Sequence, residues 1–375
     1  MGRRVGVDAT GWENRRGFGR FGRNLLTRLV EIDPDTKYVF YGQGDFPPGV
    51  EVRSVRTRAP ATDTRRPLRE LLALTRSASG RDLATFLFPS SYTYFPVFGP
   101  RVIVGILDTT SIDFPELILP AWGDRVAWRT KEWLALKQAA RVFTLSEAAR
   151  IALVDRFGLP RSRVAVVSGA ADPVFTPRPA AETECELARL GVPRGPYLLY
   201  AAGLNPHKNV ETLLDAYALL RDPPPLVLVG HLDADPYLSS AASVQERLER
   251  LPDRSRIYVT GFISDETLAR LYSGALVVVC PSLSEGFGLP PVEAATCGAP
   301  TLLSDLPAHR ETMGDAALYF PARDAVALKA QLERLLDDAE LRRRLAQRGR
   351  TNVARFSWTA SAEALQRLVH EVAGV

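Results

Sequence analysis

The sequence predicts an α/β protein built from two Rossmann-like, doubly wound parallel-sheet domains. Short apolar runs alternate with amphipathic stretches of helical period along the chain, which is typical of βα repetition and parallel sheets. The 375 residues exceed the length over which one hydrophobic core keeps growing, so two domains are expected. A proline-punctuated segment from Asp172 to Pro196 lacks a long apolar run and divides the chain near its middle.

Each half of the chain contains its own set of strand-like runs. In the first half these runs are Arg3–Asp8, Lys37–Tyr41, Glu51–Val55, Thr85–Pro89, Val102–Leu107, Val142–Leu145 and Val164–Val167. In the second half they are Tyr197–Ala201, Leu226–Val229, Ile257–Val259, Leu276–Cys280, Thr301–Leu303 and Leu318–Phe320. Helix-period stretches separate most of them, so each half is expected to form a separate sheet.

The predicted domains are residues 1–175 and residues 190–356. A short helix is expected at Ala181–Leu190, inside the linking segment. The last residues, 357–375, have helical periodicity after a break near Phe356–Ser357, which predicts a C-terminal helix. Periodicity leaves open whether this helix packs back on the first domain or on the second.

The composition indicates a globular protein without membrane-spanning segments, disulfides or a bound metal. An apolar share of 46% with 24% charged residues is ordinary for globular proteins, and no window approaches the roughly 18 uncharged apolar residues of a membrane span. The start, Met1 to Asp8, is too short and too soon acidic for a signal peptide, so we expect a cytoplasmic protein. The three cysteines and four histidines lack metal-type spacing, which predicts neither a disulfide framework nor a bound metal.

The two halves differ in charge. Residues 1–175 hold 26 Lys and Arg against 18 Asp and Glu, a net +8, while the remainder holds 21 against 25, a net −4. A basic half suits phosphorylated substrates or the anionic inner face of a cell membrane, where peripheral contact would occur. The basic residues are spread over many segments without interleaved aromatic residues, so nucleic acid is not an expected partner.

The most informative stretch is residues 282–295, which directly follows a strand-like run. It reads as strand, loop and helix, with Pro290 and Pro291 suited to the first turn of the helix. Glu285 precedes this helix and Glu293 lies about one turn inside it, so both carboxylates can border one pocket and accept hydrogen bonds from sugar and ribose hydroxyls. The competing interpretation, a capping Glu285 and a surface Glu293, leaves the surrounding glycines and prolines unexplained.

These two glutamates carry a resemblance to a known family. Glu285 and Glu293, within Ser-Glu-Gly-Phe-Gly-Leu-Pro-Pro-Val-Glu-Ala, closely resemble the E-x7-E motif of retaining family 4 glycosyltransferases with the GT-B fold, in which two such domains face a central cleft. Further segments are similar in the same order, so the resemblance covers most of the chain. They are Thr144–Glu147, Arg156–Gly158, Asn205–Asn209, Gly261–Asp265 and Pro307–Phe320.

The resemblance implies a role for several residues of a nucleotide-sugar donor site. Glu293 would hold the donor ribose, and Glu285 would hydrogen-bond the transferred sugar. Lys208 would neutralise the departing diphosphate, which must be stabilised where no metal is expected. The expected donor-binding set is completed by Gly203, Asn205, Phe262, Gly286, Phe287, Gly288 and Leu289. The resemblance assigns donor binding to the second domain and acceptor binding to the first.

The sequence departs from the family pattern at two places. Ala201 to Leu204 lacks the Arg that often precedes the phosphate lysine, and Leu107 stands where the family has a His. Asp108, which follows Leu107, is a candidate for acceptor binding or acid/base chemistry, with a structural role as a helix N-cap equally open.

A literal G-x-G-x-x-G motif, formed by Gly17, Gly19 and Gly22, invites a nicotinamide-dependent oxidoreductase as an alternative. The residues from Ala9 to Arg16 separate this motif from the strand before it, whereas a dinucleotide fingerprint begins at the strand end. The family resemblance instead assigns Gly17 and Gly19 to a loop that approaches the donor phosphates and the acceptor.

The predicted reaction is transfer of a hexosyl group, with retention, from a nucleotide-diphosphate sugar to a saccharide or lipid-linked saccharide, in cell-surface polysaccharide, lipopolysaccharide or glycoconjugate biosynthesis. No metal and no cofactor other than the donor substrate is expected. A catalytically inactive nucleotide-sugar-binding protein and a nucleotide-sugar epimerase stay open as alternatives.

Overall fold

The chain forms two compact units, each built on one parallel β-sheet. The computed structural model describes residues 4–14, 17–55, 66–80, 82–230 and 240–374. Unit 1 comprises residues 1–109, 119–169 and 356–375, and unit 2 comprises residues 110–118 and 170–355. The change of unit at Gly169 and Ala170 lies just before the proline-punctuated segment. Residues 110–118, which fall within the first predicted domain, group with unit 2.

Unit 1 contains a seven-stranded sheet with the order β3-β2-β1-β4-β5-β6-β7. Its strands are β1 (Arg4–Ala9), β2 (Lys37–Gly42), β3 (Glu51–Arg53), β4 (Thr85–Phe88), β5 (Arg101–Gly105), β6 (Ala139–Thr144) and β7 (Val164–Val166). Its helices are α1 (Gly17–Ile32), α2 (Leu68–Ala78), α5 (Trp122–Gln138), α6 (Glu147–Phe157) and α15 (Trp358–Ala373), with short 3₁₀ turns η1 (Ser91–Thr93) and η2 (Arg161–Arg163). Every paired strand runs parallel to its neighbour, as the sequence predicted.

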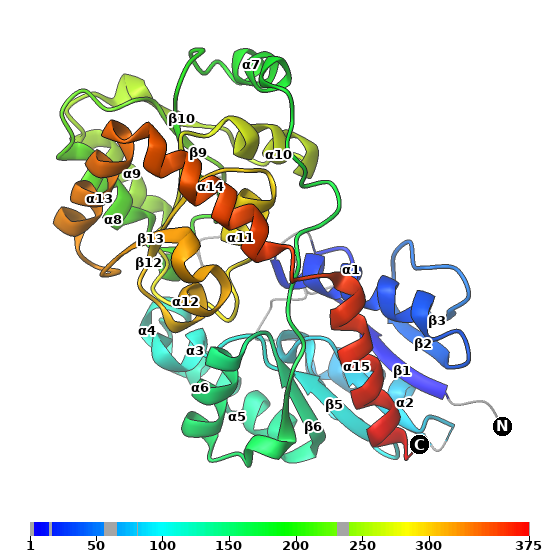
Figure 1. The fold of residues 1–375 in the computed structure, drawn as a ribbon. Coiled ribbons are helices and arrows are strands. Elements are labelled where there is room, and N and C mark those ends of the chain that lie inside the picture. The colour runs from blue at the N-terminus through cyan, green and yellow to red at the C-terminus, as the bar shows by residue number, and fades with distance from the viewer. Residues whose placement is uncertain (1–3, 15–16, 56–65, 81, 231–239, 375) are drawn as a thin grey trace. The chain divides into compact units, whose positions relative to one another are not determined.

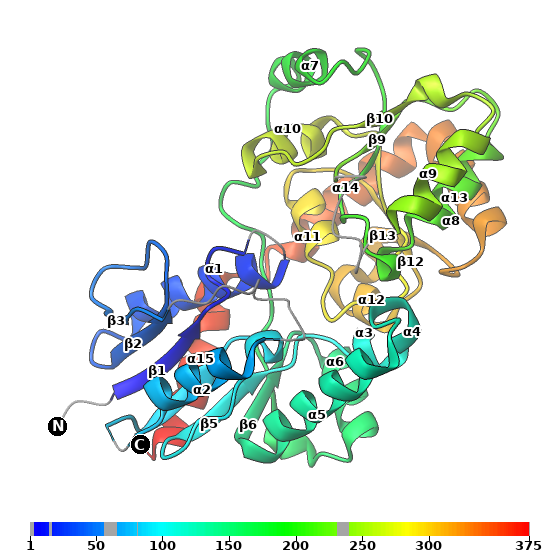
Figure 2. The same ribbon diagram turned by 180° about the vertical axis from the view of Figure 1, so that it is seen from behind.

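The two faces of this sheet are covered by different helices. Leu74 of α2, Leu136 of α5 and Leu153 of α6 belong to one apolar cluster with the strands, and Figure 2 views unit 1 from the side on which α2 and α5 lie. Figure 1 shows α15 running along α1, where the rings of Phe21 and Trp358 lie 5.8 Å apart. The C-terminal helix therefore packs within unit 1.

Unit 2 contains a six-stranded parallel sheet with the order β10-β9-β8-β11-β12-β13. Its strands are β8 (Leu198–Tyr200), β9 (Leu226–Leu228), β10 (Ile257–Val259), β11 (Val277–Cys280), β12 (Thr301–Ser304) and β13 (Ala317–Phe320). Its helices are α3 (Thr110–Asp113), α4 (Pro115–Ile118), α7 (Ala180–Arg189), α8 (Val210–Ala218), α9 (Ala241–Arg250), α10 (Asp265–Gly274), α11 (Leu289–Thr296), α12 (Pro307–Met313), α13 (Ala325–Asp337) and α14 (Ala339–Val353). Three 3₁₀ turns complete it: η3 (Pro206–Lys208), η4 (Arg254–Arg256) and η5 (Gly314–Ala316).

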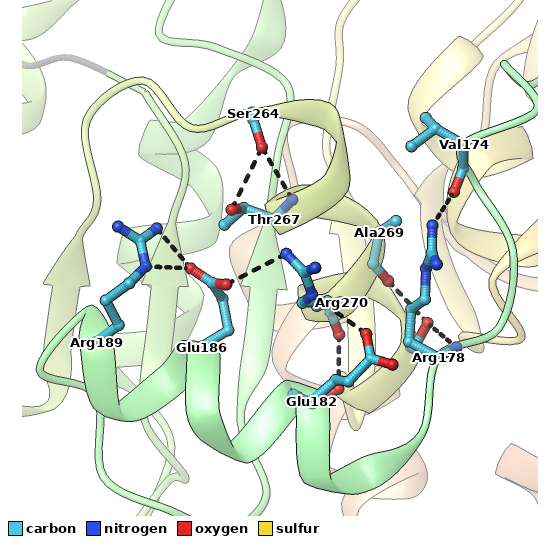
Figure 3. Close-up of polar contacts among 11 residues, drawn as sticks. Val174, Arg178, Glu182, Glu186, Arg189, Ser264, Thr267, Ala269 and Arg270 are labelled. Carbon is cyan, nitrogen blue, oxygen red and sulfur yellow. Dashed lines mark hydrogen bonds and ion pairs between the residues drawn. The ribbon is translucent and has the colours of Figure 1, made fainter.

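Helix α7, predicted at Ala181–Leu190, packs on α10 and fixes the start of unit 2. The Thr183 hydroxyl donates to the Arg270 carbonyl at 2.9 Å, and the Arg270 guanidinium reaches Glu182 at 3.3 Å and Glu186 at 3.5 Å (Figure 3). The Arg178 amide, just before α7, donates to the Ser273 hydroxyl at 3.0 Å. These contacts join the linking segment to the second sheet.

Candidate functional site

The topology of unit 2 places two predicted site residues together at one point of the sheet. From β8 the chain adds β9 and β10 on one side, and β11, β12 and β13 lie on the other, so the direction of winding reverses between β8 and β11. Ligands of open α/β sheets bind at the carboxyl ends of the strands beside such a reversal. Lys208 follows β8 and Glu285 follows β11, so the two loops are neighbours there.

Lys208 and Glu285 form an ion pair at this position. The Lys208 Nζ lies 2.6 Å from Glu285 Oε1, and the side chains are 17% and 12% exposed. The Ser282 hydroxyl donates to the same oxygen at 2.7 Å. The Leu283 amide donates to the His207 carbonyl at 2.7 Å, which ties the two loops together through the backbone. Both side-chain bonds use Oε1, so Oε2 is the oxygen placed to accept a hydroxyl from a ligand.

The charge of Glu285 is set by its cationic neighbour. Burial is the largest single influence and would raise the pKa of the Glu285 carboxyl, but the Lys208 ammonium, with smaller contributions from His309 and His207, lowers the pKa to about 2. Glu285 is therefore an anion across the physiological pH range. An ionised carboxylate accepts hydrogen bonds and does not donate them, which suits contact with sugar hydroxyls.

The loop after Glu285 leads into the amino terminus of α11, with Pro290 and Pro291 in its first turn as predicted. The amides of the N-cap and of the first three residues of a helix have no intrahelical acceptor, and here two of those four residues are prolines without N–H groups. The donors that remain are the amides of Gly288 and Leu289. Gly288 has φ +88°, and a Cβ there would lie 3.0 Å from the His309 ring, so both backbone and space require glycine.

Glu293 lies inside α11 and is 2% exposed. Its charge contributes to raised pKa values of the thiols of Cys280 and Cys297, for which burial is the larger cause. This places Glu293 on the buried side of α11, near the end of β11. Its assignment to the donor ribose stays a prediction.

His309 is a site residue that sequence reasoning missed. It follows β12, the next strand after β11 in the sheet, and its side chain is fully buried. Its Nδ1 lies 2.9 Å from the Ser304 carbonyl, so Nδ1 donates and Nε2 carries the lone pair. Burial lowers the pKa of His309, while Glu285 opposes this shift, so the imidazole is neutral at pH 7. A histidine two residues after the helix-starting Pro307 was the available signal.

The other residues predicted for the donor site differ in exposure and in their hydrogen bonds. Gly203, at φ +74°, accepts a hydrogen bond from the Tyr200 hydroxyl, and Asn205 is the N-cap of η3, where its carbonyl accepts from the Lys208 amide at 2.8 Å. Phe287 is buried, whereas Phe262 is 57% exposed. Gly286 lies buried between Glu285 and Phe287. Gly203 and Asn205 thus lie in the Lys208 loop, and Gly286 and Phe287 lie in the loop before α11.

In unit 1, Asp108 lies three residues beyond the end of β5 and accepts a hydrogen bond from the Tyr92 hydroxyl at 3.1 Å. The neighbouring Leu107 is buried. Glu132 of α5 is 3% exposed, and burial together with the negative Asp108 raises the pKa of the Glu132 carboxyl to about 7. Sequence periodicity gave no sign of Glu132, because a glutamate on a helix is usually exposed.

The glycine motif of unit 1 does not form a loop. Gly17 opens α1 and Gly19 lies in its first turn, because α1 begins earlier than the predicted loop allowed. A Cβ at Gly19 would lie 2.0 Å from the Asn14 carbonyl oxygen, so this glycine lets the backbone after β1 lie against the helix. The expectation of a glycine-bearing loop at this place is therefore wrong for both residues.

A small hollow lies at the winding reversal of the unit 1 sheet, between the ends of β1 and β4. It is lined by Asp8, Trp12, Gly19, Arg23 and Thr93, among others. Asp8 is 3% exposed, and its Oδ1 accepts from both the amide and the hydroxyl of Thr10. Asp8 and Arg23 were not among the predicted site residues, although Asp8 ends a strand-like run, which was the signal.

Among the described residues, no group of three or more His, Cys, Asp or Glu side chains is placed to hold a metal ion. Within the same ranges, no helix is both long and apolar enough to cross a bilayer.

Two doubly wound parallel sheets, one of them with a carboxylate–ammonium pair at its winding reversal, define an α/β enzyme of the GT-B fold. Residues 188–352 match the family described as Glycosyl transferases group 1. The O-antigen chain mannosyltransferase B of Escherichia coli is 30% identical to the chain, over 91% of the chain and 92% of that protein. The chain belongs to this glycosyltransferase family and is a glycosyltransferase.

Solved structures agree on the fold. Sucrose-phosphate synthase from Thermosynechococcus elongatus superposes with a TM-score of 0.80 at 20% identity, covering 99% of each chain. The Anabaena protein HepE, solved in complex with UDP-glucose, superposes with a TM-score of 0.75 at 16% identity, covering 98% of this chain and 99% of HepE. At these identities the likeness shows the architecture alone, and it confirms the predicted pair of Rossmann-like domains.

Family membership decides between two of the interpretations of the glycine motif. A nicotinamide-dependent oxidoreductase is set aside, because the chain is a glycosyltransferase. The glycines Gly17, Gly19 and Gly22 lie within α1, and at Gly19 the missing Cβ permits close backbone packing.

Proposed function

We propose that this glycosyltransferase moves a hexosyl group from a nucleotide-diphosphate sugar to an acceptor hydroxyl, with retention of the anomeric configuration. The observation that carries the proposal is the Lys208–Glu285 pair beside the amino terminus of α11. A donor of this kind presents sugar hydroxyls and a diphosphate, and the pair offers a carboxylate for the former and an ammonium for the latter.

The ion pair is compatible with a bound donor because both side chains keep further capacity for hydrogen bonds. The Lys208 ammonium has three N–H donors, so it can keep Glu285 and still donate to phosphate oxygens. Glu285 can keep Ser282 and Lys208 on Oε1 while Oε2 accepts a sugar hydroxyl. The amides of Gly288 and Leu289, at the positive end of the α11 dipole, favour an anion or an oxygen at the same place.

In the proposed reaction the sugar passes directly from donor to acceptor, without a covalent bond to the enzyme. The acceptor oxygen forms a bond to the anomeric carbon on the face that the diphosphate leaves, and the bond from that carbon to the phosphate oxygen breaks. The hydroxyl proton passes to the departing phosphate oxygen, and Lys208 stabilises the diphosphate charge. In this route Glu285 positions the sugar, and no metal or other cofactor takes part.

We place the acceptor on unit 1, where the basic excess suits a phosphorylated, lipid-linked saccharide. The similarity to the O-antigen chain mannosyltransferase B supports cell-surface polysaccharide as the product class and mannose as the first sugar to test. Gly19, Asp8 and Arg23 border the hollow at the unit 1 sheet edge and are the residues proposed to face the acceptor, together with Asp108. The enzyme would work at the cytoplasmic face of the membrane.

The first test replaces the proposed sugar contact. Glu285→Ala is expected to lower turnover by about 100-fold or more at saturating donor, because the sugar loses the carboxylate that orients it. Glu333→Ala is the control, since Glu333 pairs with Lys329 on the surface of α13. Full activity of Glu285→Ala would contradict the assignment.

Two further measurements address the donor and the inactive-binder alternative. Thermal-shift screening against uridine, guanosine, thymidine and adenosine diphosphate sugars should single out one base, because selective binding stabilises the folded state. Slow hydrolysis of that donor by the purified protein would mark an enzyme. Stabilisation without hydrolysis or transfer would mark a binding protein instead.

A further inference from the structure

Helix α5 of unit 1 exposes large apolar side chains on the face that points away from the sheet. Trp122 is 75% exposed and Trp133 is 57% exposed, and Val126 lies between them in the same row. An adjoining face of the helix packs into unit 1 through Trp128, Ala135 and Leu136. Exposed tryptophans cost hydration free energy, so two on one helical face indicate a surface that is covered by a partner.

Cationic side chains lie in the same row. The positions of Trp122, Val126, Arg129, Trp133 and Lys137 follow the three- and four-residue spacing of one helical face, which we name the α5 outer face. Arg129 and Lys137 have no acidic partner among the residues that the structure describes, and the Lys137 ammonium lies 5.9 Å from the Trp133 ring centre. The surface therefore combines aromatic and positive groups.

Few acidic groups oppose this charge. Along α5 the basic residues are Arg125, Arg129, Lys131 and Lys137, and the acidic residues are Asp124 and Glu132. Glu132 is buried toward the sheet, so it does not reach the outer face. A positively charged helical face with tryptophans suits an interface that is itself negative on its surface and apolar just below it.

We propose that the α5 outer face docks on an anionic lipid bilayer, with Trp122 and Trp133 in the headgroup region and Arg129 and Lys137 against the lipid phosphates. Tryptophan prefers the boundary between headgroups and acyl chains, and cationic side chains are drawn to an anionic leaflet. A second copy of the chain would bring the same positive face against itself, so charge complementarity favours the lipid. The helix lies in the plane of the surface and does not cross the bilayer.

A second helix on the same side of the sheet extends this surface. Leu68 and Leu72 of α2 are exposed, and α2 shares its apolar cluster with α5. Figure 2 shows both helices on the side of unit 1 facing the viewer. Contact through α5 would turn the outer side of α2 toward the same bilayer.

A chain bound to the bilayer through the α5 outer face would have unit 1 close to a lipid-linked acceptor. Only this connection between lipid binding and the acceptor rests on the proposed function. Binding of vesicles needs no glycosyl transfer. Failure of lipid binding and failure of the transfer reaction are therefore seen in separate assays.

The experiment measures co-sedimentation of the full chain with vesicles of phosphatidylglycerol and phosphatidylcholine, and with phosphatidylcholine alone, at low and high salt. The wild-type chain should bind the anionic vesicles at low salt and be released by salt. Trp122→Ser with Trp133→Ser should lower the partition coefficient about tenfold or more, because two interfacial rings are lost. Arg129→Glu with Lys137→Glu should weaken binding similarly and remove its salt dependence.

The control is Leu219→Ser with Val326→Ser, which removes exposed apolar side chains from unit 2 and should leave vesicle binding unchanged. All variants should keep the wild-type melting temperature and the wild-type rate of donor hydrolysis. The proposal fails if the double tryptophan variant binds as the wild type does, or if neutral vesicles bind equally well. It also fails if sedimentation without lipid shows a dimer that the double tryptophan variant abolishes, since the face would then join two copies.

Discussion

Two glutamates that are largely shielded from solvent, one in each unit, differ by about five units in the pKa of their carboxyls. Glu285 lies beside Lys208, and its pKa is about 2. Glu132 lies near Asp108, and its pKa is about 7. Burial pushes both pKa values upward, so the sign of the neighbouring charge decides the difference. A buried carboxylate paired with an ammonium stays charged, whereas one facing a second carboxylate holds its proton.

The difference indicates different chemical roles. Glu285 is an anion poised to accept hydrogen bonds at the winding reversal of unit 2. Glu132 exchanges its proton near neutral pH, and Asp108 is one of the groups that cause this. Lys131, on the same helix, and a hydrogen bond from Trp128 partly offset the upward shift. Removing the Lys208 charge beside Glu285, and the ionisable carboxyl of Glu132 itself, tests whether the comparison holds.

The largest effect is expected from Lys208→Met, which keeps the length of the side chain and removes its charge. Turnover should fall by about 100- to 1,000-fold, because the leaving diphosphate loses its ammonium. The pKa of Glu285 should rise above its present value of about 2, since burial then acts unopposed by Lys208. Initial rates at saturating donor and the pH dependence of the melting temperature measure both effects.

The sign of the accompanying pH effect follows from the lowered pKa. In the wild type the ionised Glu285 contributes stability above its ordinary pKa of 4.5, and this is lost as the pH falls toward 2. In Lys208→Met the folded-state pKa of Glu285 should lie closer to 4.5 or above it, so the contribution should shrink and any loss that remains should be complete at a higher pH than in the wild type. Lys329→Met, which removes an exposed pair at 2.8 Å, is the matched control and should change little. Equal losses in both variants would mean that the Lys208 pair has no special role.

The second prediction concerns Glu132→Gln. Because the folded state of the wild type binds the Glu132 proton more tightly than the unfolded chain does, its stability is highest below pH 4.5 and falls as the pH rises to about 7. The pKa of Glu132 changes from 4.5 in the unfolded chain to about 7 in the folded protein. At about 1.4 kcal/mol per pKa unit, the free energy of unfolding should fall by about 3 kcal/mol over this pH range. The glutamine variant cannot ionise there, so this part of the pH dependence should disappear.

Tryptophan fluorescence during urea unfolding is the appropriate measurement for this variant. All five tryptophans, Trp12, Trp122, Trp128, Trp133 and Trp358, belong to unit 1, the unit that contains Glu132. Parallel pH profiles for the wild type and Glu132→Gln would contradict a raised pKa at this residue.

The smallest effect is expected from His309→Asn. An asparagine amide can keep the donor toward the Ser304 carbonyl while the lone pair at the Nε2 position is lost. A neutral imidazole holds no charge at pH 7, so turnover should fall by no more than about tenfold, well short of the Lys208→Met loss. Rates measured from pH 5 to pH 8 check this order, and a His309→Asn loss as large as that of Lys208→Met would reverse it.

Much of the fold could be predicted from local patterns. Each strand-like run corresponds to a strand of the expected sheet, either with the predicted bounds, as at Ile257–Val259, or with shifts at its ends. Short apolar runs between helical stretches are typical of buried parallel strands. The helix start at Pro290 and Pro291 and the C-terminal helix from Trp358 also followed the prediction.

The sequence-based predictions were wrong or incomplete where packing between distant segments determines the conformation or the burial of a residue. Gly17 and Gly19 lie in α1 and not in a loop, and the missing Cβ of Gly19 allows the Asn14 carbonyl to lie against the helix. Glu132 gave no signal of its own, and His309 gave only its place after Pro307, since burial of a polar side chain depends on which helix face meets the sheet.

The sequence by itself determined the alternation of strands and helices, the two-domain organisation, and the loop–helix motif that carries Glu285 and Glu293. Only the tertiary structure decided that Lys208 and Glu285, 77 residues apart, form one ion pair. The reason is the strand order: β8, β11 and β12 are neighbours in the sheet, so the loops after them meet at its carboxyl edge. Which strands become neighbours depends on packing between distant segments, and no local pattern of residues encodes it.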